Sequence, residues 1–168
     1  MPIFRRHSSY TGEWSGGRIQ PSSLASQADS EVWLALPNDN EGEQVWEALN
    51  AQTIDTDLLE LRAVPALAYG VRFGDRVSVV GAGDNALVVD AIRERSSFVT
   101  FRIWIGEDVA PSLTWRPLAE ALAQLGCLVD VYSTRLIAVA CAEPDVGTVR
   151  AVLEAQADAS GLVWEQSA

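Results

Sequence analysis

The chain of 168 residues has little of the chemistry on which many enzymes depend: it contains one histidine, His7, and two cysteines, Cys127 and Cys141. A histidine-dependent catalytic triad or a histidine-rich metal site needs a histidine in the folded body. His7 lies in a polar N-terminal segment that we expect to be flexible. Two cysteines are too few for a disulfide framework, and they lack the paired spacing of a zinc site. We therefore expect no catalytic residues, no metal site and no cofactor.

Long apolar runs and basic residues are also scarce. After Met-Pro-Ile-Phe-Arg-Arg the sequence turns polar, without the apolar stretch that a signal peptide or membrane helix requires. The chain carries 12 basic residues against 23 acidic ones, a formal charge of −11. Such a surface repels phosphate backbones and anionic lipids and attracts basic proteins, although acidity can also serve solubility alone. We expect a cytoplasmic protein that binds neither nucleic acid nor membrane.

What is present is enough apolar material for a core, at 48% hydrophobic residues, arranged in three parts. Residues 1–29 are rich in Ser, Gly and Gln without a hydrophobic period, which predicts a flexible arm. Tyr10 and Trp14 in this arm either dock on the body or form a short partner-binding peptide. Residues 30–96 predict a small β module, with strands over 31–36, 44–53, 58–64 and 86–92, and with a turn at Gly74-Asp75 that leads into a further alternating segment ending at residue 80.

Residues 97–168 alternate two helical patterns with four strand patterns. The expected strands cover 98–105, 127–132, 136–141 and 162–165, and the expected helices cover about 115–125 and 146–157. Thr114 and Asp145 are plausible helix N-caps, and Gly126 ends the first helix. The order β-α-β-β-α-β is the ferredoxin-like pattern. We therefore predict an α+β fold, in which a small N-terminal β module (a partly open barrel or sheet) precedes a ferredoxin-like module.

Six segments carry a family resemblance when they are taken in order: Val32-Trp33-Leu34, Gln44-Val45-Trp46-Glu47-Ala48, Ala63 to Val71, Gly74-Asp75-Arg76-Val77, Arg95 to Arg102 and Leu125-Gly126-Cys127. Together they resemble the bacterial domain-of-unknown-function family 4265 over about residues 31–166. The sequence departs from the family pattern at Ser97, where a glycine is usual, and at Phe98, where a polar residue is common. Because that family has no agreed activity, the resemblance implies architecture more than function.

The segment Gly81-Ala82-Gly83-Asp84-Asn85-Ala86 follows a strand pattern and imitates a dinucleotide-binding fingerprint. In that fingerprint the glycines bring a pyrophosphate to the N-terminus of a helix. Residues 86–92, however, also suit a strand, and a strand–turn–strand arrangement provides no helix N-terminus. The sequence favours a hairpin turn here. A small-molecule or nucleotide-binding enzyme centred on this segment remains an alternative.

Two smaller features have a structural and a functional interpretation. If residues 133–135 form a tight connection, Cys127 and Cys141 lie nearly opposite each other on adjacent strands, as a packing contact or as a redox pair. Asp75 follows Gly74 in a predicted turn. Its carboxylate is expected to accept hydrogen bonds from nearby backbone N–H groups.

The sheet face opposite the helices is the best candidate for a binding surface. Alternation places Phe98, Arg102 and Trp104 on that face, and neighbouring strands can add Tyr132 and Trp164. Aromatic residues and arginine dominate interface hot spots, so this platform suits a basic peptide or protein. Alternatively, the N-terminal β module or a second subunit covers it, because large apolar patches rarely stay exposed.

These observations favour a non-enzymatic binding protein that engages a basic protein partner. An immunity or inhibitor protein that neutralises a toxin or an enzyme is one specific form of this hypothesis. The alternatives are the enzyme centred on Gly81 to Ala86 and a structural subunit that forms a homodimer through its sheet face.

Overall fold

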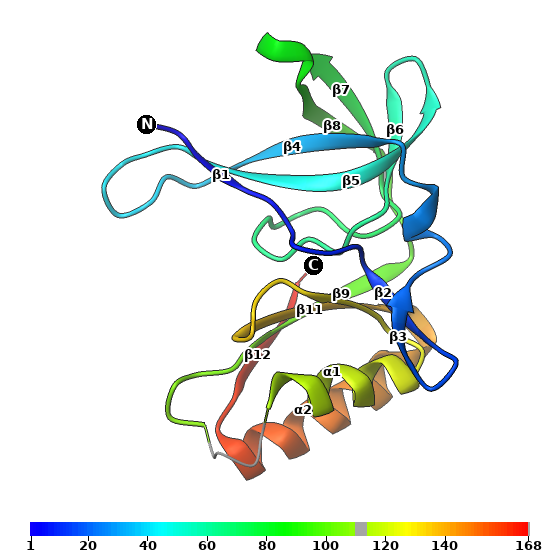
Figure 1. Ribbon diagram of the computed structural model, residues 1–168, viewed down its shortest axis with the longest axis vertical. Helices are drawn as coiled ribbons and strands as arrows, with labels where there is room; N and C mark the ends of the chain where they lie inside the picture. Colours follow the sequence, from blue (N-terminus) through cyan, green and yellow to red (C-terminus); the bar gives the residue numbers. More distant parts are fainter. Residues whose placement is uncertain (110–113, 168) are drawn as a thin grey trace.

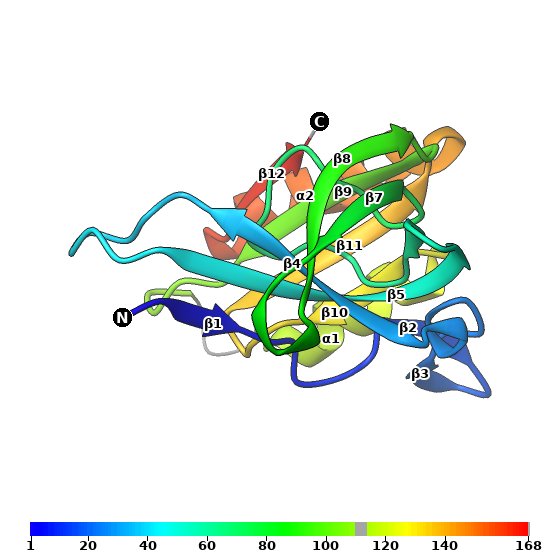
Figure 2. The same cartoon turned by 90° about the horizontal axis from the view of Figure 1, so that it is seen from above.

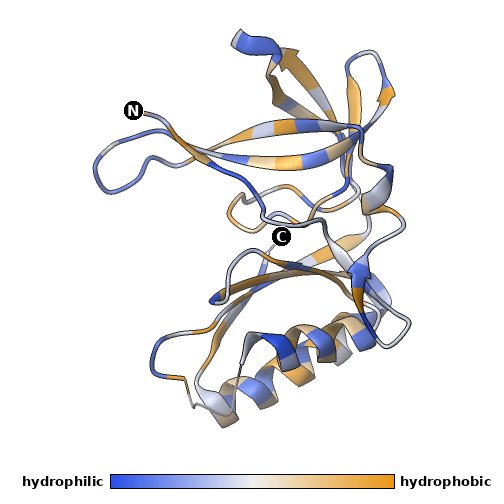
Figure 3. Cartoon of the chain, in the orientation of Figure 1, coloured by the Kyte–Doolittle hydropathy of each residue, from blue (hydrophilic) through white to orange (hydrophobic). Residues whose placement is uncertain are grey.

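The computed structural model describes residues 1–109 and 114–167. Of these residues 43% lie in strands and 21% in helices. The strands form two six-stranded sheets, one above the other in Figure 1. Hydrophilic residues dominate the β4–β5 loop, whereas the strands beside it carry many apolar residues (Figure 3).

The first sheet contains a closed five-stranded barrel. Its strands are β4 (Ser30–Leu36), β5 (Val45–Asp55), β6 (Leu58–Leu61), β7 (Arg76–Gly81) and β8 (Leu87–Glu94). The ring closes because β5 pairs with β4 on one side and β6 on the other, while β8 pairs in parallel with β4. A further strand, β1 (Ile3–Arg5), joins the outer part of β5. The barrel is filled by alternate side chains that include Val32, Leu49, Leu61 and Val77.

The second sheet has the order β12-β9-β11-β10-β2-β3. Its strands are β2 (Gly12–Ser15), β3 (Arg18–Pro21), β9 (Phe98–Trp104), β10 (Leu128–Val131), β11 (Leu136–Ala142) and β12 (Val163–Ser167). The helices α1 (Trp115–Gln124) and α2 (Val146–Ser160) cover one face (Figure 1). Leu122 and Leu153 from these helices share a buried cluster with Phe101, Ile103 and Ile137 of the sheet.

The barrel covers the other face of the second sheet, so the sheet lies between the barrel and the helices (Figures 1 and 2). The contact between barrel and sheet is a separate apolar cluster, which joins Val64 and Phe73 to Leu128, Leu136 and Ala138. Val64 and Phe73 belong to the long connection between β6 and β7. This connection therefore acts as the packing layer between the two sheets.

The predicted fold class is wrong. The protein is mostly β, the barrel is closed rather than partly open, and the helical half is not the predicted ferredoxin-like module. Its sheet has six strands because β2 and β3 from the N-terminal segment extend it beyond β10. The order of elements along the chain does not reveal this addition, nor the parallel pairing of β4 with β8 that closes the barrel.

The N-terminal segment 1–29 is also folded, contrary to the predicted flexible arm. It contributes β1 to the first sheet and β2 and β3 to the second. Gly16 and Gly17, with φ of 61° and 79°, form the turn between β2 and β3, and left-handed residues of this kind suit a two-residue hairpin turn. Trp14 and Ile19 face each other across that hairpin and pack on the helical core. Of the two interpretations of Trp14, the structure therefore shows docking on the body.

Both helices begin where they were predicted to begin, but α2 extends to Ser160, beyond the predicted residue 157, and the predicted capping hydrogen bonds are absent. Thr114 and Asp145 occupy the N-cap positions of α1 and α2, yet neither side chain makes a capping hydrogen bond. Gly126 follows α1 with a φ of 90°, a conformation that glycine adopts without strain. Across the described residues, no helix combines the length and apolar character needed to cross a membrane.

Candidate functional site

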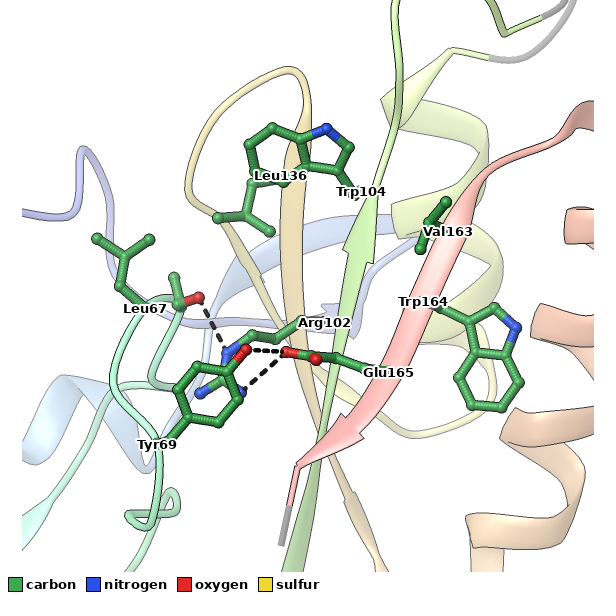
Figure 4. A pocket seen from close by; sticks show the side chains of 9 residues that line it. Leu67, Tyr69, Arg102, Trp104, Leu136, Val163, Trp164 and Glu165 are labelled. Carbon is green, nitrogen blue, oxygen red and sulfur yellow. Dashed lines mark hydrogen bonds and ion pairs between the residues drawn. The ribbon is translucent and has the colours of Figure 1, made fainter. Parts of the chain in front are cut away.

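An open pocket lies at one end of the second sheet, beside the connection between β6 and β7 (Figure 4). Its volume is about 390 Å³. Its lining is predominantly apolar and comes from Ala66, Leu67, Tyr69, Arg102, Trp104, Leu136, Val163, Trp164 and Glu165. We refer to it as the Trp104 pocket.

The floor of the Trp104 pocket consists of two successive rows of the sheet. In the first row, Trp104 on β9 lies between Leu136 on β11 and Val163 on β12. In the second row, Arg102 on β9 lies opposite Glu165 on β12. Because every second residue of a strand points to the same face, the two rows share the barrel side of the sheet. Antiparallel register alone therefore assembles this floor.

Arg102 attaches the wall of the pocket, the segment Ala66 to Tyr69, to this floor. Its Nε donates to the carbonyl oxygen of Ala66 at 3.0 Å, and its Nη2 donates to the carbonyl oxygen of Ala68. The guanidinium also lies 4.4 Å from the ring centre of Tyr69. Tyr69 Oη donates to Glu165 Oε1 at 2.7 Å, and this hydrogen bond, together with burial, raises the pKa of Tyr69. Figure 4 shows the three side chains converging at one side of the pocket.

Glu47 on β5 holds the same segment from the barrel side. Its carboxylate is fully buried and accepts hydrogen bonds from the backbone N–H groups of Ala66 at 2.8 Å, Leu67 at 3.2 Å and Ala68 at 2.6 Å. The backbone N–H groups of the wall therefore donate to the Glu47 carboxylate, and its backbone carbonyl groups accept from the Arg102 guanidinium. Charge-assisted hydrogen bonds are stronger than neutral ones, so this double attachment makes the wall rigid.

His7 connects Glu47 to the second sheet. Its Nε2 lies 2.7 Å from Glu47 Oε1, its Nδ1 lies 2.7 Å from Asp130 Oδ2, and its side chain is only 5% exposed. Burial opposes protonation, but the hydrogen bonds to Asp130 and Glu47 outweigh it and raise the pKa of His7 to about 9. The imidazolium form therefore prevails at neutral pH, and both ring nitrogens donate. Burial also raises the pKa of Asp130. We call His7, Glu47 and Asp130 the buried cluster.

The expectation that His7 lies outside the folded body is wrong, because the N-terminal segment carries it between the two sheets. Its chemistry is nevertheless constrained. Both ring nitrogens are engaged by carboxylates, and the three side chains are almost entirely removed from solvent. A general base needs a free lone pair within reach of a substrate proton, and the imidazolium offers none. The geometry is that of a buried ionic bridge between barrel and sheet.

The Trp104 pocket differs from the buried cluster in its exposure. Trp104, Tyr69 and Val163 are 52%, 66% and 67% exposed. Arg102 is buried and lies 3.5 Å from Glu165, so the positive charge beneath the pocket is balanced by its neighbour. The pocket is consequently an accessible aromatic and aliphatic surface with one half-exposed carboxylate at its side.

The structure separates the five residues predicted to form one platform. Trp104 and Arg102 lie in the pocket, Trp104 accessible and Arg102 buried beneath the wall. Phe98 packs edge-to-face on Phe73 in the contact with the barrel, with ring centres 5.3 Å apart. Tyr132 packs edge-to-face on His7 at 5.2 Å. The ring of Trp164 points toward the helices (Figure 4), 5.9 Å from Phe101.

Most of the predicted platform is therefore covered by the barrel, which was the alternative interpretation of that face. Sequence reasoning missed the pocket residues Tyr69, Val163 and Glu165. The sequence contained a signal for Val163 and Glu165, because side chains of the expected strand over residues 162–165 alternate between the two faces of the sheet. When Trp164 faces the helices, Val163 and Glu165 must face the barrel side.

The glycine segment forms the connection between β7 and β8. A 3-10 turn covers Gly83–Asn85, and β8 begins at Leu87. Asp84 and Asn85 are left-handed, with φ of 58° and 60°, as suits a tight turn. A strand follows where the dinucleotide fingerprint requires a helix, so the turn presents no helix N-terminus to a phosphate.

Asp75 and the two cysteines have structural surroundings. The buried Asp75 carboxylate accepts from the backbone N–H groups of Arg72 at 2.9 Å and Ser96 at 2.7 Å, which confirms its predicted role. Cys127 and Cys141 are buried and unbridged, beside the cross-strand pair Leu128–Ala140. The neighbouring Cys141 thiol, followed by burial, raises the pKa of the Cys127 thiol.

The described part of the chain holds no group of three His, Cys, Asp or Glu side chains suited to a metal ion.

The model of the family described as Domain of unknown function (DUF4265) matches residues 47–164. The chain belongs to this family. The family resemblance noted in the sequence is thereby confirmed, although the segment Val32-Trp33-Leu34 lies outside the matched residues.

Two further comparisons bear on the fold. No curated protein matches the chain. The crystal structure of a hypothetical protein from Neisseria gonorrhoeae is similar at a TM-score of 0.60 and 15% sequence identity, over 82% of this chain and 93% of that chain. This similarity shows a shared fold.

Proposed function

We propose that the protein is a non-enzymatic binding protein that engages a basic partner protein through the Trp104 pocket. An immunity or inhibitor protein, which neutralises a toxin or an enzyme, is one form of this function. The partner places an apolar side chain in the pocket and basic residues on the surrounding acidic surface. We infer a cytoplasmic location, where the two unbridged cysteines stay reduced.

One observation carries the proposal: an open pocket with half-exposed aromatic walls on a protein with a net charge of −11. Exposed aromatic side chains in a shaped pocket are typical anchors of protein interfaces. A large net charge steers partners of opposite charge and raises their association rate. The two features together favour a basic protein over a neutral small molecule.

The polar groups around the pocket are already engaged in hydrogen bonds with other groups of the protein, which supports binding over catalysis. Arg102 is committed to backbone carbonyls, Glu165 to Tyr69 and Arg102, and Glu47 to three backbone N–H groups and His7. A nucleophile and a general base need mutual contact and access to a substrate. The engaged groups around the pocket hold its shape.

The test is affinity capture from the source organism with a matched pair of variants. Val163→Glu places a carboxylate in the pocket, and Val80→Glu makes the same substitution at the end of β7, where Val80 is 51% exposed. We expect the wild type and Val80→Glu to retain one basic protein in a salt-sensitive manner, and Val163→Glu to retain at least about tenfold less. Capture of no basic protein, or equal capture by both variants, would contradict the proposal.

A further inference from the structure

Strand β12 ends the second sheet, and its outer edge is available for pairing. Among the described strands it pairs only with β9. An edge strand presents one row of unpaired N–H and C=O groups, which an extended peptide from another protein can complete. The edge therefore offers main-chain hydrogen bonds directly beside the pocket.

The side chains of β12 divide between the two faces of the sheet. Val163 and Glu165 point to the pocket side, opposite Trp104 and Arg102, while Trp164 packs toward the helices. A strand added outside β12 continues the same alternation, because the side-chain period of a sheet is two residues. Every second residue of such a peptide would face the pocket side, and one of these residues would extend the Leu136–Trp104–Val163 row and reach the pocket.

The charge of this edge selects the partner. Residues 146–167, which contain α2 and β12, include Glu154, Asp158 and Glu165 and one basic residue, Arg150. All three carboxylate residues are exposed. A second copy of the chain, whose net charge is also −11, would bring the same carboxylates to this edge, so self-pairing is opposed by repulsion. A basic segment is attracted by the same charges.

We propose that the partner binds as an extended basic segment that adds a strand to the outer edge of β12. Its apolar residues, at every second position, face the pocket side, where one of them extends the Trp104–Val163 row, and the arginine or lysine residues between them point to the helix side and face the carboxylates of α2. This inference rests on the proposed function and specifies its binding mode. Main-chain pairing supplies affinity, and the pocket supplies selectivity.

The test uses a blocked synthetic peptide about eight residues long, within the usual range of strand lengths, in which leucine and arginine alternate. A control peptide of the same composition places all leucines before all arginines. Isotope-labelled full-length protein is titrated with each, following backbone amides and the Trp104 indole N–H by NMR. We expect the alternating peptide to shift the Trp104 signal and to slow hydrogen exchange at alternate amides of β12. The Trp104→Glu variant is expected to bind it at least about tenfold more weakly.

Two N-methylated versions of the alternating peptide make the test decisive. Each carries N-methyl groups on one of the two alternating sets of amides, so strand addition predicts that one version binds and the other does not. Equal behaviour of the two versions, preference for the block peptide, or no binding at millimolar peptide would overturn strand addition. If capture depends on Val163 while the methylated peptides behave alike, the proposed function stands and this binding mode fails. If the peptides show alternation but no basic protein is captured, the edge has the inferred chemistry and the proposed function fails.

Discussion

The buried cluster and the Trp104 pocket lie on the same side of the second sheet, yet they use opposite chemistry. The cluster consists of charged groups without solvent, with His7 5% exposed and Glu47 fully buried. The pocket consists of aromatic and aliphatic groups open to solvent, with Trp104 52% exposed. Buried charges persist when they are paired and hydrogen-bonded, whereas exposed apolar groups in a pocket favour a partner. The comparison places the histidine among the groups that hold the fold together and supports the proposal that the tryptophan serves binding.

The two regions are nevertheless linked by the segment Ala66 to Tyr69. Glu47 holds the backbone N–H groups of this segment, and Arg102 holds its carbonyl groups. The same segment forms the wall of the Trp104 pocket. Under the proposed function, the ionic groups would serve binding indirectly, by holding the wall in place.

The largest expected effect follows from deleting residues 1–21, which removes β1, β2, β3 and His7. Glu47 and Asp130 would then be buried without their cation, and β10 would lose its pairing with β2. Leaving a buried charge unpaired costs about 3–5 kcal/mol, so we expect no cooperative thermal transition. The measurement is circular dichroism on heating, and an unchanged transition would show that the segment is a dispensable arm.

Glu47→Ala tests the cluster with a single side chain. It removes the acceptor of three backbone N–H groups and of His7, and we expect a loss of about 3–5 kcal/mol in the free energy of unfolding. Urea denaturation measures this, with Glu41→Ala in the exposed β4–β5 loop as the control. A loss below about 1 kcal/mol for Glu47→Ala would show that the buried cluster contributes little to the free energy of unfolding.

The pH dependence of stability tests the charge of His7. Because the folded-state pKa is raised to about 9, His7 contributes stability that is complete below its ordinary value of 6.5 and lost as pH rises through 9. A shift of this size corresponds to about 3 kcal/mol. We expect the wild type to lose more stability over this window than His7→Gln. Parallel curves for the two proteins would argue against a protonated His7.

Among the changes to the buried cluster and the wall, Tyr69→Phe is expected to have the smallest effect on stability. It removes the hydroxyl that donates to Glu165, but the ring stays over Arg102 and the group is mostly exposed. We expect the free energy of unfolding to fall by less than about 1 kcal/mol. Denaturation of the variant beside the wild type checks this, and a larger loss would mean that the wall depends on Tyr69 more than on Glu47 and Arg102.

The strands and helices from residue 30 onward were largely predictable, because their periodicity is local. The strand over 98–105 and the helices beginning at 115 and 146 correspond to β9, α1 and α2 within a few residues. The closed barrel was not predictable in this way, since it depends on pairing β4 with β8 across more than fifty residues. Gly16-Gly17 between Trp14 and Ile19 is a hairpin signal that was overlooked because the surrounding composition indicates disorder.

The candidate site was predictable only in part. Alternation placed Trp104 and Arg102 on the correct face, but their exposure depends on how far the barrel extends over the sheet. Trp104 lies beyond the barrel contact that covers Phe98. His7 could not be assigned from sequence, because its partners Glu47 and Asp130 lie 40 and 123 residues away.

The central claim is that Trp104 serves binding and not folding, and Trp104→Glu tests it most directly. The variant is measured twice, for capture of the basic partner and for the free energy of unfolding. We predict that capture falls at least about tenfold while the free energy of unfolding changes by less than about 0.5 kcal/mol. Undiminished capture by a folded Trp104→Glu protein would contradict the account.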